Sequence, residues 1–133
     1  MDFEYVKVIK SDLDDIDEAF SFILGKLSSV IRDEELMFNI RIVINEIVIN
    51  SYEHGNKCNK EKGINLKVCV NLDCIHINVK DEGDGINYIF NENKDINTTT
   101  SGRGLRIVKH LVDELEINNN EISAKIKCET DDV

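Results

Sequence analysis

The sequence predicts an α+β fold, a two-layer sandwich in which helices cover one face of a mixed, mainly antiparallel sheet. Apolar residues recur at helical spacing in three segments, residues 13–31, 33–52 and 105–115. Between and after them, short runs alternate apolar and polar residues, as half-buried strands do. No repeat, linker or low-complexity block divides the 133 residues, so we expect a single domain over residues 1–133.

The first two predicted elements are a strand over residues 3–9 and a helix after it. Ser11 or Asp12 is the expected N-cap of the helix, and acidic residues in its first turn suit the positive end of the helix dipole. The residues at helical spacing are Leu13, Ile16, Phe20, Ile23, Leu24, Leu27, Val30 and Ile31.

A second helix is predicted from about Asp33 to Tyr52, although this stretch is rich in β-branched residues that individually favour strands. Its apolar residues do not alternate, and helical spacing fits them better. The expected inner face consists of Ile40, Val43, Ile44, Ile47, Val48 and Ser51.

The second half of the chain is predicted to form a β-hairpin, a polar loop, a third helix and two strands. The hairpin turns at residues 71–74, and its buried positions are Ile64, Leu66, Val68, Val70, Leu72, Ile75, Ile77 and Val79. A polar loop over residues 91–101 precedes the third helix, whose apolar face is Leu105, Val108, Leu111, Val112 and Leu115. The last two strands flank residues 118–120 and contribute Ile117, Ile122, Ala124, Ile126 and Cys128.

Charge and cysteine content restrict the class of protein. The formal net charge of -10 repels phosphate backbones and anionic lipid, so we expect no direct nucleic-acid partner and no membrane. A basic protein partner would be attracted, and an acidic surface equally serves solubility. The four cysteines form no C-x-x-C pair, which argues against structural zinc and for reduced thiols in the cytoplasm.

The first candidate motif lies on the second predicted helix. Glu46, Asn50 and His54 are spaced i, i+4 and i+8, so they would share one helix face. An asparagine carbonyl suits Mg²⁺, and a carboxylate one turn away can polarise a hydroxyl that attacks a terminal phosphate. By itself, this spacing also fits the solvated side of an ordinary amphipathic helix.

The second motif follows the hairpin directly. Asp81 begins a D-x-G-x-G sequence that contains Gly83 and Gly85. Glycines allow the backbone to approach a flat ligand closely, and a buried carboxylate can accept a hydrogen bond from an exocyclic amine such as that of adenine. Taken alone, the sequence also fits an ordinary glycine-rich turn.

The third motif lies where the polar loop enters the third helix. Ser101, Gly102, Arg103 and Gly104 precede Leu105 there, and the free N–H groups of a helix N-terminus favour anions. This is neither a Walker P-loop nor a dinucleotide turn, and Arg103 is either a phosphate contact or a solvated side chain. Together, the three motifs supply the parts of one nucleotide site: metal and γ-phosphate, base, and phosphate chain.

In this order, the motifs resemble the ATP-binding superfamily shared by gyrase, the heat-shock chaperone, histidine kinases and mismatch-repair proteins (GHKL, the Bergerat fold). Within it, the segment from Glu46 through Asn50 to His54-Gly55-Asn56 resembles the N-box of bacterial anti-sigma factor serine-protein kinases. The residue after Asn50, usually alanine in that family, is Ser51 here.

The resemblance implies a role for each motif. Glu46 would be the general base toward a substrate serine, and Asn50 would bind Mg²⁺. Asp81 would bind the adenine amine of ATP in a pocket shaped by Gly83 and Gly85, while Gly102 and Gly104 would lie against the phosphates beneath a lid over residues 88–101.

The same resemblance implies partners. Members of that family are typically homodimers that bind a sigma factor and phosphorylate an anti-anti-sigma protein. Residues 1–9 are a candidate edge strand for pairing in such a dimer.

Two other functions remain open on the sequence alone. One is a non-catalytic ATP-binding switch whose lid orders without phosphoryl transfer. The other is an ATPase or a histidine-kinase catalytic domain that acts on a phosphoacceptor in a separate chain.

Overall fold

In the computed structural model, the backbone is described for residues 3–83 and 100–128, and side chains for residues 3–83 and 104–128. Along the chain, single strands or strand pairs are separated by one or two helices. The elements are β1 (Phe3–Lys10), α1 (Leu13–Val30), α2 (Glu34–Asn50), a π-helical turn (Ser51–Gly55), β2 (Gly63–Val70), β3 (Cys74–Lys80), α3 (Thr100–Leu111), β4 (Glu114–Asn118) and β5 (Glu121–Lys127).

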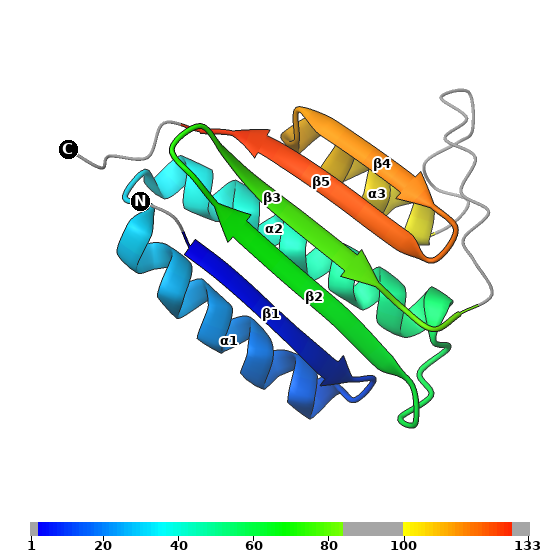
Figure 1. The fold of residues 1–133 in the computed structure, drawn as a ribbon. Helices are drawn as coiled ribbons and strands as arrows, with labels where there is room; N and C mark the ends of the chain where they lie inside the picture. Colours follow the sequence, from blue (N-terminus) through cyan, green and yellow to red (C-terminus); the bar gives the residue numbers. More distant parts are fainter. Residues whose placement is uncertain (1–2, 84–99, 129–133) are drawn as a thin grey trace.

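The five described strands form one sheet in the order β1-β2-β3-β5-β4, and all four pairings among them are antiparallel. The three described helices lie on one face of this sheet, with α2 between α1 and α3 (Figure 1). This arrangement confirms the predicted two-layer α+β sandwich.

The hydrophobic core fills the space between the sheet and the helices. On β2 and β3, the residues predicted to face inward are buried, and they are Ile64, Leu66, Val68, Val70, Ile75, Ile77 and Val79. The predicted inner face of α2 is also confirmed, since Ile40, Val43, Ile44, Ile47, Val48 and Ser51 are each at most 3% exposed. Burial of this stripe at helical spacing outweighs the strand propensity of its β-branched residues.

The two long helices begin differently. The Asp33 side chain caps α2 by accepting hydrogen bonds from the backbone N–H groups of Glu35 (3.0 Å) and Leu36 (3.1 Å). Asp12 is the N-cap residue of α1, but its side chain makes no capping bond. Ser11, the other predicted cap, is wholly buried and accepts a hydrogen bond from Asn56 instead.

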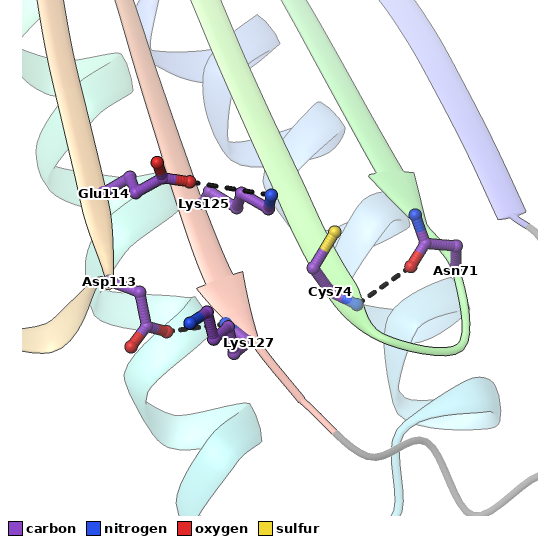
Figure 2. Close-up of polar contacts among 6 residues, drawn as sticks. All are labelled: Asn71, Cys74, Asp113, Glu114, Lys125 and Lys127. Carbon is purple, nitrogen blue, oxygen red and sulfur yellow. Dashed lines mark hydrogen bonds and ion pairs between the residues drawn. The ribbon is translucent and has the colours of Figure 1, made fainter.

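Two predicted boundaries were wrong. Leu72 lies in the β2–β3 turn and is 54% exposed, because the Asn71 side chain accepts from the N–H of Cys74 and ends the strand there (2.9 Å, Figure 2). The third helix ends at Leu111, so Val112 lies beyond it and Leu115 belongs to β4, opposite Ala124. The spacing of both residues fits a helix, and the N–H of Val112 still donates to the Val108 carbonyl (3.1 Å). Leu115 instead pairs with β5, which satisfies its backbone groups.

The start of β4 is fixed by contacts with β5. The N–H of Asp113 donates to the Lys125 carbonyl (2.9 Å), and the Asp113 carboxylate accepts from the N–H of Lys127 (2.6 Å). Figure 2 also shows the ion pair between Glu114 and Lys125, in which Nζ and Oε2 lie 3.6 Å apart. The chain therefore leaves α3 immediately and joins the sheet.

The end of α2 departs from regular α-helix. The chain continues from Asn50 into the π-helical turn, in which the N–H of Asn56 donates to the carbonyl of Ser51 (2.8 Å). Lys57 and Cys58 then adopt left-handed backbone conformations, with φ of 51° and 60°, and reverse the chain toward β2. The π turn leaves Gly55 and Asn56 buried at the end of the helix.

The described residues contain no candidate membrane span, no disulfide and no cluster of metal ligands. None of the helices in this part of the chain is both long and apolar enough to cross a membrane. All four cysteines are free thiols. No group of three or more His, Cys, Asp or Glu side chains in the described ranges is arranged to hold a metal ion.

Candidate functional site

Glu46 and Gly104 come from different helices and lie against each other. A Cβ built on Gly104 would collide with the Glu46 carboxyl group and would lie only 3.3 Å from its Cδ atom. The carboxylate on α2 therefore reaches the N-terminal half of α3 because Gly104, the fifth residue of that helix, has no side chain. Figure 1 shows the two helices packed beside each other under the sheet. This contact joins the first and third predicted motifs.

Asn50 is the last residue of α2 and lies one turn after Glu46 on that helix. It is 6% exposed, an unusual position for an asparagine. The pair therefore places a carboxylate and a nearly buried amide in succession along the same helix. That donor set suits a hard cation that keeps phosphate oxygens and waters as its other ligands.

Asp81 follows β3 and is 2% exposed. Its backbone is held from the β4–β5 turn, where its N–H donates to the Asn120 carbonyl (3.0 Å) and its own carbonyl accepts from Asn120 Nδ2. One carboxylate oxygen, Oδ1, accepts from the N–H of Gly83 (2.7 Å). The other, Oδ2, is buried and makes no hydrogen bond with any of the described residues.

The electrostatic state of Asp81 follows from this burial. Loss of solvent raises the pKa of its carboxyl group, while the N–H of Gly83, the positive charge of Lys62 and the hydroxyl of Ser51 offset part of the rise. Ser51 Oγ lies near the carboxylate, but neither it nor Asp81 Oδ2 makes a hydrogen bond of regular geometry. A buried acceptor without a partner is costly, and an exocyclic amine from a ligand would satisfy it.

Gly55 and Gly83 allow the backbone to close around this carboxylate. A Cβ on Gly55 would overlap the Asp81 carboxyl group, and one on Gly83 would overlap the Gly55 carbonyl. The end of the π turn, the Asp81 side chain and the turn at Gly83 are therefore stacked without intervening side chains. This stack holds the carboxylate in one place.

Three residues near Asp81 were not predicted as site residues: Ser51, Gly55 and Asn56. Gly55 and Asn56 belong to the segment that resembles the N-box, but continued α-helical spacing would not predict their contacts. The π turn places Gly55 against Asp81 and Asn56 against the N–H of Glu82, and the sequence carries no clear signal for this turn. The one signal in the sequence is a glycine followed by a polar residue, Gly55-Asn56, at the end of the predicted helix.

His54 lies beyond the regular part of α2, in the π turn, and its side chain is 43% exposed. The prediction assumed an unbroken α-helix through this residue. Its Nε2 atom lies 3.8 Å from the Glu53 carboxylate. Asn50, by contrast, is nearly buried.

The remaining predicted residues fall into two groups. Leu105 is 1% exposed and its side chain is part of the core, so only its backbone is available to a ligand. Ser101, Gly102 and Arg103 belong to the first turn of α3, but their side chains lie outside the described part. Gly85 and residues 88–99 of the predicted lid also lie outside the described residues.

A separate cavity of about 640 Å³ lies at the other end of β3, where that strand begins. Its lining residues are Asn71, Asp73, Cys74, Lys125, Lys127 and Cys128. Four of them are labelled in Figure 2, which shows them around the β2–β3 turn and the end of β5. None of the predicted site residues lines this cavity.

Comparison with known proteins identifies the family of this chain. Residues 9–126 match the model of the histidine kinase-like ATPase domain. The chain is also similar to proteins named Anti-sigma F factor, with 29% identity over 92 residues in Bacillus thuringiensis (strain Al Hakam), 30% in Bacillus cytotoxicus and 29% in Bacillus mycoides (strain KBAB4). In each case the match covers 65% of this chain and 63% of the relative, so it spans under two-thirds of the relative's length.

Proposed function

Because the chain belongs to the histidine kinase-like ATPase domain family, we propose that it is an ATP- and Mg²⁺-dependent serine-protein kinase that also acts as an anti-sigma factor. The observation that carries this proposal is the position of Glu46. Its carboxylate lies one turn before Asn50 and against Gly104, which directly follows the first turn of α3. A base is thus held between a candidate metal ligand and a helix N-terminus that suits phosphate.

In the proposed reaction, Glu46 accepts the proton of a substrate serine hydroxyl. The serine oxygen forms a bond to the γ-phosphorus of ATP, and the bond from that phosphorus to the β,γ-bridging oxygen breaks, which releases ADP. Mg²⁺ bound with Asn50 would neutralise charge on the phosphate oxygens. The free backbone N–H groups of Ser101 and Gly102, in the first turn of α3, would hold the phosphate chain, with Arg103 and Gly104 as further contacts.

Asp81 anchors the opposite end of the nucleotide in this proposal. The free Oδ2 atom would accept a hydrogen bond from the adenine amine. Gly55 leaves room for the Asp81 carboxyl group, and Gly83 leaves room for the Gly55 carbonyl, so the carboxylate is held in place for the base. The buried acceptor without a partner is the feature of this structure that fits adenine.

The proposed partners are a sigma factor and an anti-anti-sigma protein that carries the substrate serine. The named relatives support the anti-sigma role. The net charge of -10 favours a basic surface on a protein partner. We also propose a homodimer, since β1 is an edge strand of the sheet and exposes Val6 (60%) and Val8 (64%).

The test is incubation of the chain with γ-³²P-labelled ATP, Mg²⁺ and the purified anti-anti-sigma protein from the same cells. A kinase of the proposed type places acid-stable label on a serine of that protein. Acid-labile label on another chain points to histidine-kinase chemistry instead. Nucleotide binding with no label on any partner points to a non-catalytic switch, and either outcome contradicts the proposal.

A further inference from the structure

Asn56 lies at the centre of a buried hydrogen-bond network. The residue is wholly buried, and its Nδ2 atom donates to Ser11 Oγ (2.7 Å) and to the Gly63 carbonyl (2.9 Å). Its Oδ1 atom accepts from the N–H of Glu82 (2.8 Å). A single side chain therefore connects the β1–α1 junction, the first residue of β2 and the turn that follows β3.

The turn after β3 is attached to the first residue of β2 a second time. The Glu82 carboxylate accepts a hydrogen bond from the N–H of Gly63. Ser11, which also binds the Asn56 side chain, is fixed because its own N–H donates to the Lys62 carbonyl (3.1 Å). The groups that bind Asn56 are thus themselves held by backbone hydrogen bonds, so the network fixes the turn after β3 relative to β2 and the β1–α1 junction.

The residue held by Asn56 stands between the two that form the proposed adenine pocket. Glu82 lies between Asp81 and Gly83, and its N–H is the donor that Asn56 satisfies. A shift of this peptide would move the Asp81 carboxylate and the N–H of Gly83 together. We propose that Asn56 is a positioning residue that sets the preference of the nucleotide site for adenine, an inference that rests on the proposed function.

The experiment compares the affinities for ADP and IDP, in which a carbonyl oxygen replaces the exocyclic amine of adenine. Isothermal titration measures both affinities for the full chain and for Asn56→Ala, Ser11→Ala and Asn59→Ala. Asn59 lies in the same connection but is exposed, and its side chain accepts only from the N–H of Glu61 (3.0 Å), so it is the matched control.

The wild-type chain is expected to bind ADP at least about tenfold more tightly than IDP. In Asn56→Ala this ratio should fall by about fivefold or more. The N–H of Glu82 in the turn after β3 loses its acceptor, and the connection from residue 56 to the Gly63 carbonyl is lost with it. Ser11→Ala, which keeps both of those bonds, should lower the ratio by about twofold. Asn59→Ala should leave it unchanged.

A purely structural role predicts a different result. It would lower the melting temperature without nucleotide and weaken ADP and IDP binding by the same factor, so an unchanged ratio in folded Asn56→Ala overturns the inference. If that variant does not fold, an unchanged ratio in Ser11→Ala overturns it. A wild-type chain that binds both nucleotides equally, or neither, overturns the proposed adenine pocket itself.

Discussion

The Glu46 carboxylate occupies the space that a side chain at Gly104 would need. The two residues lie on α2 and α3, so the packing of these helices sets where the carboxylate lies. Movement of the first turn of α3 would therefore move the group proposed to act as base. Glycine at residue 104 is therefore needed both for the packing of α2 against α3 and for the position of the Glu46 carboxylate.

Gly104→Ala tests this relationship. The added Cβ would force the Glu46 carboxylate or the α3 turn to shift, so we expect phosphoryl transfer to fall by about tenfold or more and the free energy of unfolding to fall by about 1–3 kcal/mol. Urea denaturation and a transfer assay with labelled ATP measure the two effects.

Gly25→Ala is the matched control for that substitution. Gly25 lies inside α1, and a Cβ there would meet nothing within 4 Å. Alanine should therefore stabilise the protein by about 0.5–1 kcal/mol through its higher helix propensity, with no change in transfer. Equal effects of the two substitutions would contradict the contact between Glu46 and Gly104.

Asp81→Asn tests the cost of burying a charge at the site. Since burial raises the pKa of Asp81 in the folded state, its contribution to stability is fully present below the unfolded pKa and is lost as the pH rises through the folded pKa. The asparagine can still accept from the N–H of Gly83 but carries no charge. The unfolding free energy of Asp81→Asn relative to wild type should therefore increase from about pH 4 to pH 7, while ADP binding weakens.

Chemical denaturation of both proteins across that pH range checks the prediction. A difference that stays constant with pH, or that moves in favour of the wild-type protein as the pH rises, would contradict the burial argument.

The fold itself offers a comparison of two helix caps. Asp33 accepts two backbone hydrogen bonds, whereas Asp12 holds the same position on α1 without a side-chain bond. Asp33→Ala should cost about 1 kcal/mol of unfolding free energy, and Asp12→Ala clearly less. Melting curves of the two variants measure this difference, and a larger loss in Asp12→Ala would be inconsistent with the observed capping.

Much of this architecture could be predicted because burial repeats with the period of each element. The stripe from Ile40 to Val48 identified α2 despite its β-branched residues, and alternation identified the β2–β3 hairpin. The end of α3 could not be predicted, because Leu115 fits both the helical spacing of Val108 and Leu111 and the alternation of β4. Only pairing with β5, a nonlocal contact, decides between them.

The candidate site divides in the same way. Glu46 and Asn50 were predictable because both lie within regular α-helix, where spacing defines the face. The neighbours of Asp81 were not, since Gly55 reaches Asp81 and Asn56 reaches Glu82 through a π turn that local sequence does not specify. The same turn, rather than regular α-helix, contains His54. The roles of these residues toward ATP and Mg²⁺ stay predictions.

Glu46→Gln tests whether Glu46 activates a serine hydroxyl. Glu34→Gln, at an exposed position of the same helix, is the matched control. The measurement is the single-turnover rate of label transfer from γ-³²P-ATP to the anti-anti-sigma protein, together with ADP affinity. We expect Glu46→Gln to lower the rate by about 100-fold or more with ADP affinity within about twofold of wild type, and Glu34→Gln to change neither. Transfer by Glu46→Gln at the wild-type rate would contradict the account.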